Sequence, residues 1–249
     1  MMTDYFKPVP FDLFKSDKKA FGDALCRSFR ETGFAVVSGH TVDQGVIDRN
    51  LDATKAFFAL PDAEKLKYDG RQGGGQRGYT AFGTENAKGN AHADLNEFWH
   101  TGRALPEDSP YRATMADTPS VPEVPAFDGA TTALFDALDE MGREILEGVA
   151  LHLGLAEDWF DDKVNFGNSI LRLLHSPPQQ TPPPADTVRA GAHEDINVIT
   201  LLLGAEEAGL QVLHSSGEWL DVNPPAGALV INCGDMLQRL TGGVLPSTT

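Results

Sequence analysis

Cysteine is scarce in this chain of 249 residues, which contains only Cys26 and Cys233. A small fold held together by disulfides needs several pairs, so this count excludes a disulfide framework and favours a reducing compartment. We therefore predict a cytoplasmic protein. We expect both thiols to be ordinary buried core side chains.

Positive charge is limited as well, with 20 Lys and Arg against 36 Asp and Glu and a net charge of −16. Without a basic cluster, neither nucleic acid nor an anionic membrane is an expected partner. No stretch approaches the ~18 uninterrupted apolar residues of a membrane span. The first residues also lack the basic and then apolar pattern of a secretory signal. These absences indicate a soluble globular protein.

Helical patterns occupy the first two thirds of the chain. Ser16 is the expected N-cap of a helix whose apolar face carries Phe21, Leu25 and Phe29, and Gly33 is expected to end it. The longest pattern lies between Pro125 and Leu155. Its predicted apolar face consists of Leu134, Leu138, Met141, Ile145 and Val149.

After Trp159 the sequence changes to short apolar segments separated by Gly, Pro, Asn and Ser. Turn signals at intervals of about 8–15 residues are typical of an antiparallel sandwich or barrel rather than of alternating strands and helices. The predicted fold class is therefore mainly β with flanking helices.

His193 and Asp195 stand two residues apart in "AGAHEDINVITLLLG", at the start of a predicted strand. Side chains two apart on a strand face the same side, so these two should point together while Glu194 points away. An imidazole and a carboxylate are two of the three ligands in the 2-His-1-carboxylate triad that holds non-haem Fe(II). The spacing alone leaves a second interpretation open, namely a solvated pair in a surface turn.

Several longer motifs surround this pair. They are "RGYTAFGTENAKG" from Arg77, "DLNEFWHTGR" from Asp94, "LRLLHSPP" from Leu171, and "GEWLDVNPPAGALVINCGDMLQRLTGG" from Gly217. In these motifs, and in their order along nearly the whole chain, the sequence resembles the isopenicillin N synthase-like family of Fe(II)- and 2-oxoglutarate-dependent oxygenases.

The resemblance implies a double-stranded β-helix, or jelly roll, behind a helical N-terminal region. It divides the chain into residues 1–120, the helical region, and residues 121–249, the long helix with a catalytic core that lacks its C-terminal end. His193 and Asp195 would be metal ligands. The family's third ligand is a histidine that follows a segment like "GDMLQRLTGGVLPSTT", which is where the sequence stops. We expect a longer enzyme; a naturally short relative is the alternative.

The implied activity is oxidation of a small molecule by O2, with Fe(II) as the metal and 2-oxoglutarate as co-substrate. Hydroxylation, desaturation or ring closure would accompany the release of succinate and CO2. Some family members do not use 2-oxoglutarate, so that assignment stays open. The alternative function is a metal-incompetent jelly-roll relative that acts as a binding or interaction module.

Substrate contacts in this family come partly from the N-terminal region, which makes Arg77, Tyr79 and Trp99 the candidate substrate-binding residues. An alternative exists for each of them. Tyr79 and Trp99 could be packing residues, because buried aromatic side chains contribute much of a core. Arg77 could be a solvated charge in a loop.

Overall fold

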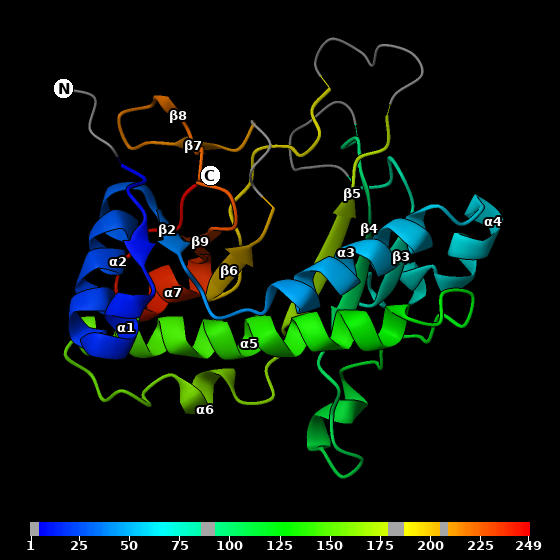
Figure 1. Cartoon of the computed structure of the whole chain (residues 1–249), viewed down its shortest axis with the longest axis horizontal. Coiled ribbons are helices and arrows are strands. Elements are labelled where there is room, and N and C mark those ends of the chain that lie inside the picture. Colours follow the sequence, from blue (N-terminus) through cyan, green and yellow to red (C-terminus); the bar gives the residue numbers. More distant parts are fainter. Residues whose placement is uncertain (1–4, 86–92, 179–186, 205–208) are drawn as a thin grey trace. The chain divides into compact units, whose positions relative to one another are not determined.

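The computed structural model describes residues 5–85, 93–178, 187–204 and 209–249 (Figure 1). The α-helices are α1 (Asp12–Ser16), α2 (Lys18–Thr32), α3 (Gln44–Phe58), α4 (Asp62–Lys65), α5 (Phe127–His152), α6 (Asp161–Val164) and α7 (Asp235–Leu240). Three short 3-10 helices are η1 (Leu66–Tyr68), η2 (Gly70–Gly73) and η3 (Pro110–Ala113). The strands are β1 (Val9–Pro10), β2 (Phe34–Ser38), β3 (Gly78–Thr80), β4 (Glu97–Gly102), β5 (Ile170–His175), β6 (Ile199–Leu202), β7 (Gln211–Leu213), β8 (Trp219–Asp221) and β9 (Leu229–Cys233).

Among the residues that the structure describes, helix exceeds strand, at 38% against 17%. The expected combination of sheets and flanking helices is present, but strands do not predominate. The cause is element length. Helix α5 has 26 residues, whereas β4 and β5 have only 6 each.

The residues group into two compact units, and neither is continuous in sequence. Unit 1 comprises Met1–Thr41, Glu140–Val164 and His193–Thr249, and unit 2 comprises Val42–Asp139 and Asn165–Ala192. Each unit thus combines residues from both sides of the division expected near residue 120. The division into residues 1–120 and 121–249 stays a prediction.

Unit 1 contains a four-stranded sheet in the order β1-β2-β9-β6 and a separate β7-β8 hairpin. Strand β9 is central and antiparallel to both neighbours, with Asn232 opposite Phe34 on β2 and Thr200 on β6. All five residues of β9 are buried, which suits a run of apolar side chains covered on both faces. The sheet therefore places Thr200 beside Asn232.

Helix α2 lies against β1 and β2 in unit 1 (Figure 1). Its predicted face of Phe21, Leu25 and Phe29 is completely buried. The predicted N-cap was wrong by one residue: Asp17, not Ser16, accepts a hydrogen bond from the amide of Ala20 at 2.9 Å. A carboxylate at this position also interacts favourably with the helix dipole. Gly33 ends the helix as predicted, with φ of 76°.

The long predicted helix is confirmed as α5. Leu134, Met141, Ile145 and Val149 are buried, whereas Leu138 is half-buried. Cys26 on α2 and Cys233 on β9 are free and buried, as expected. Burial raises the pKa of the Cys26 thiol to about 12, so it stays protonated and unreactive at neutral pH.

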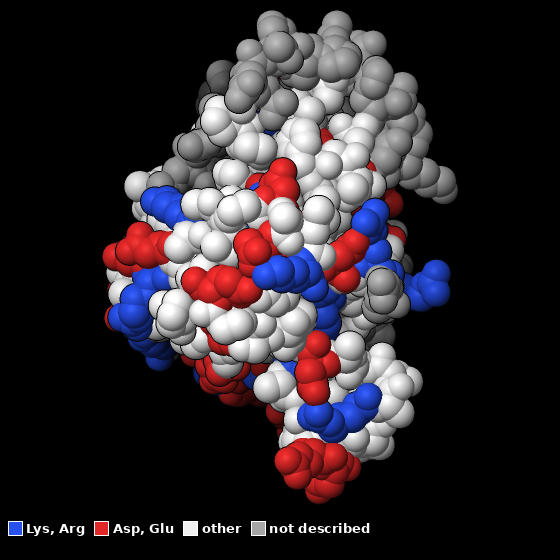
Figure 2. Space-filling view, turned by 90° about the vertical axis from the view of Figure 1, so that its right-hand side faces the viewer, with Lys and Arg blue, Asp and Glu red and all other residues white. Residues whose placement is uncertain are grey.

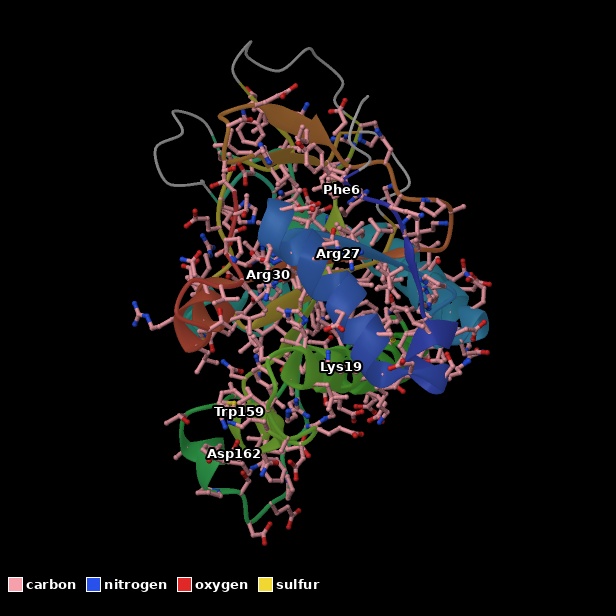
Figure 3. All side chains as sticks on the ribbon, turned by 90° about the vertical axis from the view of Figure 1, so that its left-hand side faces the viewer. Phe6, Lys19, Arg27, Arg30, Trp159 and Asp162 are labelled. Atoms are coloured by element: carbon pink, nitrogen blue, oxygen red, sulfur yellow. The ribbon has the colours of Figure 1, made fainter. Side chains whose placement is uncertain are left out.

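The outer side of α2 is polar, and Lys19, Arg27 and Arg30 lie along it (Figure 3). Lys19 pairs with Asp23 at 2.9 Å, and Arg30 lies 2.8 Å from Nε2 of His152. The other ring nitrogen of His152 lies 2.7 Å from the Asp23 carboxylate, so the two contacts of His152 join the end of α5 to α2.

Unit 2 contains the antiparallel sheet β3-β4-β5 and an aromatic core. Phe57 of α3 is at the centre of that core, with ring centroids of Trp99 and Phe127 at 4.9 and 4.8 Å. Such pairs add stabilisation beyond the area they bury. On the face drawn in Figure 2, acidic and basic side chains are interspersed rather than separated into patches. Among the described residues, no helix has the length and apolar character needed to span a bilayer.

Candidate metal centre

His193 and Asp195 lie together at the start of the last segment of unit 1. The Nε2 atom of His193 is 3.6 Å from Oδ1 of Asp195. The imidazole is well exposed, at 60%, whereas the carboxylate is 27% exposed. The two side chains therefore converge, with the histidine open to solvent.

The backbone here differs from the sequence prediction. Strand β6 begins only at Ile199, and the segment from His193 to Ile196 forms neither helix nor strand. Alternation along a strand is thus not what brings the two side chains together. The amide of Asp235 instead donates to the carbonyl of Asp195 at 2.7 Å, which fixes this segment against the start of α7.

Gly234 makes that close approach possible. A Cβ atom at this position would lie 2.1 Å from the backbone oxygen of Asn197, a distance that no side chain tolerates. The amide of Gly234 donates to the carbonyl of Val198 at 3.0 Å, and that of Met236 donates to Asn197 at 3.1 Å. The "NCGD" sequence therefore holds the residues that follow His193.

The carboxylate of Asp195 is held through one of its two oxygens. Oδ2 accepts a hydrogen bond from the Thr200 hydroxyl and another, at 2.9 Å, from Nδ2 of Asn232. Oδ1 is the oxygen nearer His193. The carboxylate thus presents one oxygen toward the histidine while β6 and β9 hold the other.

Glu194 takes no part in this arrangement. Its Oε1 lies 3.5 Å from the Thr249 hydroxyl, and the residue is exposed. No third histidine, cysteine, aspartate or glutamate joins His193 and Asp195 in the part of the chain that the structure describes.

The remaining histidines have other partners or other positions. His100 lies 2.7 Å from the Gly75 carbonyl and His175 lies 2.8 Å from Glu97, both in unit 2. His214 contacts Ser216 at 2.8 Å in the turn after β7, and His40 is half-buried after β2. His92 is outside the described residues.

The three candidate substrate-binding residues all lie in unit 2, and all are buried. Trp99 is completely buried and Tyr79 is 2% exposed. The Tyr79 hydroxyl donates to Glu97, and the indole of Trp99 donates to Thr101 at 3.0 Å. Both side chains thus fill the core of unit 2. A role in substrate binding stays a prediction.

Arg77 is not a solvated loop charge, since it is only 6% exposed. Its guanidinium donates to the Gln76 carbonyl and to Asn168, each at 2.7 Å. It lies flat on Gly102, where a Cβ atom would be 1.9 Å from Cζ. Burial lowers the pKa of Arg77, and its substrate-binding role also stays a prediction.

Two family models match the chain in order. The first, non-haem dioxygenase in morphine synthesis N-terminal, matches residues 9–123. The second, 2OG-Fe(II) oxygenase superfamily, matches residues 167–249 and includes His193 and Asp195. The chain belongs to the 2OG-Fe(II) oxygenase superfamily.

Similar proteins in this superfamily include the 2-oxoglutarate-Fe(II) type oxidoreductase hxnY of Emericella nidulans, 34% identical over 84% of this chain. Among solved structures, a 2OG-Fe(II) oxygenase family protein of Caulobacter crescentus is 52% identical, covers 99% of this chain and has a TM-score of 0.91. This chain covers 79% of that structure. A full-length Neurospora crassa protein in complex with alpha-KG and thymine is 26% identical and has a TM-score of 0.83. That match covers 100% of this chain and 80% of the other.

The chain spans 62% of the length of hxnY and 65% of an Aspergillus fumigatus 2-oxoglutarate-Fe(II) type oxidoreductase that is 32% identical. It therefore corresponds to less than two thirds of these two relatives.

The residues present are compatible with the iron of 2OG-Fe(II) oxygenases. An imidazole nitrogen and one carboxylate oxygen converge at 3.6 Å, and this combination of ligands suits non-haem Fe(II). Thr200 and Asn232 were not among the residues predicted from the sequence. Neither residue forms a recognisable sequence motif with Asp195, and only the pairing of β6 with β9 brings them together.

Proposed function

We propose that the whole protein is a non-haem Fe(II)- and 2-oxoglutarate-dependent oxygenase that oxidises a small molecule. The observation that carries the proposal is the convergence of His193 Nε2 with Asp195 Oδ1, while Asp195 Oδ2 is held by two donors. Membership of the superfamily, and the alpha-KG complex of the similar Neurospora crassa protein, support the same activity.

In this proposal His193 and Asp195 are two of the iron ligands. Bound Fe(II), with 2-oxoglutarate and O2, would supply the oxidising power for hydroxylation, desaturation or ring closure, releasing succinate and CO2. His193 must offer Nε2 in its neutral form, because a protonated imidazole has no lone pair for a metal. Asp195 contributes a negative charge that partly balances the charge of Fe(II).

The proposal extends to the fold. The β1-β2-β9-β6 sheet and the β7-β8 hairpin of unit 1 are proposed to form part of the double-stranded β-helix. The similarity to solved 2OG-Fe(II) oxygenases supports this jelly-roll assignment. Residues 1–120 would then be the helical N-terminal region and residues 121–249 would contain the catalytic core.

The substrate is proposed to be a small molecule, in keeping with the thymine held in the similar Neurospora crassa complex. Arg77, Tyr79 and Trp99 are retained as proposed substrate-binding residues. Since all three are buried, any contact with substrate would require an opening in unit 2.

The test is succinate formation by the whole protein purified without oxygen and supplied with Fe(II), 2-oxoglutarate and O2. His193→Ala and Asp195→Ala should both abolish it. His193→Ala should leave the unfolding temperature nearly unchanged, because this side chain is well exposed. Asp195→Ala should also lower the unfolding temperature, because the buried Asn232 loses its hydrogen-bond acceptor. Glu194→Gln is the matched control, since this neighbouring carboxylate faces Thr249. Equal losses in all three variants would contradict the proposal, as would Fe(II) binding that does not depend on His193. The interaction-module alternative predicts no iron binding at all.

A further inference from the structure

Two side chains from neighbouring strands hold the same oxygen of Asp195. Thr200 on β6 and Asn232 on β9 are directly opposite each other in the antiparallel sheet. The hydroxyl of Thr200 and Nδ2 of Asn232 both donate to Oδ2, the second at 2.9 Å. Asn232 is only 9% exposed, so this is a built contact within the sheet and not a chance encounter of surface side chains.

The direction of the Thr200 hydrogen bond is fixed by a third residue. Nδ2 of Asn197 lies 2.8 Å from the Thr200 oxygen and can only donate to it. The hydroxyl proton of Thr200 is then available for Asp195. The result is a chain of hydrogen bonds from Asn197 through Thr200 to Oδ2, joined there by Asn232 from the other strand.

We infer that Thr200 and Asn232 are positioning residues that fix the Asp195 carboxylate so that Oδ1 alone is presented beside His193 Nε2. This inference rests on the proposed iron site. A carboxylate with both oxygens free can rotate about its terminal bond, whose preferences are broad. Two donors on Oδ2 remove that freedom before any metal binds, and they leave Oδ1 toward the histidine at 3.6 Å.

The expected size of the effect follows from the behaviour of other metal sites. Partners that hydrogen-bond to metal ligands orient them, and removing one such partner typically costs about 10- to 100-fold in metal affinity or activity. Loss of the Asn232 side chain should have a larger effect than loss of Asn197, because Asn232 donates directly to Asp195 and is buried. Asn197 should have the smaller effect, because Thr200 keeps its own hydroxyl when Asn197 is lost.

The experiment is a titration of the whole protein with Mn(II), a redox-silent stand-in for Fe(II), followed by electron paramagnetic resonance. The variants are Thr200→Val, which replaces the hydroxyl with a methyl group, Thr200→Ser, which keeps it, and Asn232→Leu. Gln211→Leu is the matched control. Gln211 donates an amide hydrogen bond to Asp221 at 2.9 Å on the β7-β8 hairpin, away from the hydrogen bonds that hold Asp195.

Thr200→Val and Asn232→Leu should weaken Mn(II) binding about 10- to 100-fold and broaden the resonance, while Thr200→Ser and Gln211→Leu bind like the wild type. Because Asn232→Leu changes a buried residue, the unfolding temperature of this variant is measured too. The comparison of Thr200→Val with Thr200→Ser tests the hydrogen bond without changing a buried residue. Wild-type affinity in both Thr200→Val and Asn232→Leu would overturn the inference and leave the iron site standing. Absence of His193-dependent Mn(II) binding in the wild type would overturn the proposed function and the inference together.

Discussion

Lys65 and Glu97 form a buried ion pair in unit 2, with Nζ 2.8 Å from Oε2 and with side chains only 5% and 4% exposed. Glu97 also accepts a hydrogen bond from Tyr79 and lies 2.8 Å from Nδ1 of His175. Burial by itself raises the pKa of the Glu97 carboxyl. The hydrogen bonds from Lys65, Tyr79 and His175 outweigh burial and hold that pKa below its ordinary value.

Glu97→Gln should therefore destabilise the protein by about 3–5 kcal/mol, because it leaves the Lys65 ammonium buried without its main counter-charge. The measurement is urea unfolding at neutral pH. Glu64→Gln is the control: Glu64 pairs with Lys67, whose side chain is 55% exposed, and removing such a surface pair costs less than about 1 kcal/mol. Similar costs for the two variants would show that the buried pair contributes no more than the surface pair.

His100 should make the stability depend on pH. Arg172 donates through Nε to Nε2 of His100 at 2.8 Å, so the ring is neutral and its other nitrogen donates to the Gly75 carbonyl. Burial, helped by the positive charge of Arg172, lowers the pKa of His100 from 6.5 to about 4. Between these values the unfolded chain binds a proton that the folded chain does not.

The contribution of neutral His100 to the free energy of unfolding is thus fully present above pH 6.5, the ordinary pKa of histidine. It is lost as the pH falls toward 4. The loss at pH 4 should be roughly 3 kcal/mol. Urea unfolding of the wild type and of His100→Gln over this range measures it, with His214→Gln as the control. The difference between wild type and His100→Gln should shrink as the pH falls. A pH-independent difference would mean that His100 is not buried in its neutral form.

Sequence patterns predicted those features that depend on local periodicity. The apolar face of α2 and the extent of α5 follow from spacing and from residues that end helices, and the structure confirms them. The pairing of His193 with Asp195 was also anticipated, although through a strand that does not extend so far. The segment that carries both residues is instead held by the backbone hydrogen bond between Asp195 and Asp235, which are 40 residues apart and share no pattern.

The features that could not be predicted depend on partners far away in the sequence. Asn232 looks like one polar residue in an apolar strand, and only its register with Thr200 shows that both hold Asp195. The burial of Arg77 is similar. Arg77 can be buried only because Gly102, at the end of β4, has no side chain. Nothing near Arg77 in the sequence indicates this contact.

Trp99 should behave as a packing residue. It is completely buried, with the rings of Phe57, Tyr68 and Phe127 at 4.9, 5.8 and 5.1 Å. Trp99→Ala is expected to cost about 3–5 kcal/mol because it leaves a large cavity. Trp219→Ala is the control, since Trp219 is 46% exposed on β8 and should change stability by about 0.5 kcal/mol or less. Equal, small effects on thermal unfolding would indicate that Trp99 is free to serve the substrate instead.

Helices α2 and α5 approach each other closely in unit 1 at Gly22 and Gly148. A Cβ atom on Gly22 would lie 1.9 Å from the carbonyl oxygen of Gly148, which belongs to the backbone and cannot rotate away. Gly22→Ala must therefore push the helices apart. Overpacking of this kind costs about 1–3 kcal/mol, more than the gain of up to about 1 kcal/mol from replacing a helical glycine.

Gly142→Ala separates the two effects. Gly142 lies in the middle of α5, where an added Cβ would meet only Leu201 Cδ1 at an ordinary 3.9 Å. This variant should be more stable than the wild type by about 0.5–1 kcal/mol, because alanine restricts the unfolded chain and favours helix. Thermal unfolding of both variants at one pH tests the pair. Opposite shifts are expected, and a stabilised Gly22→Ala protein would show that α2 and α5 do not pack at this distance.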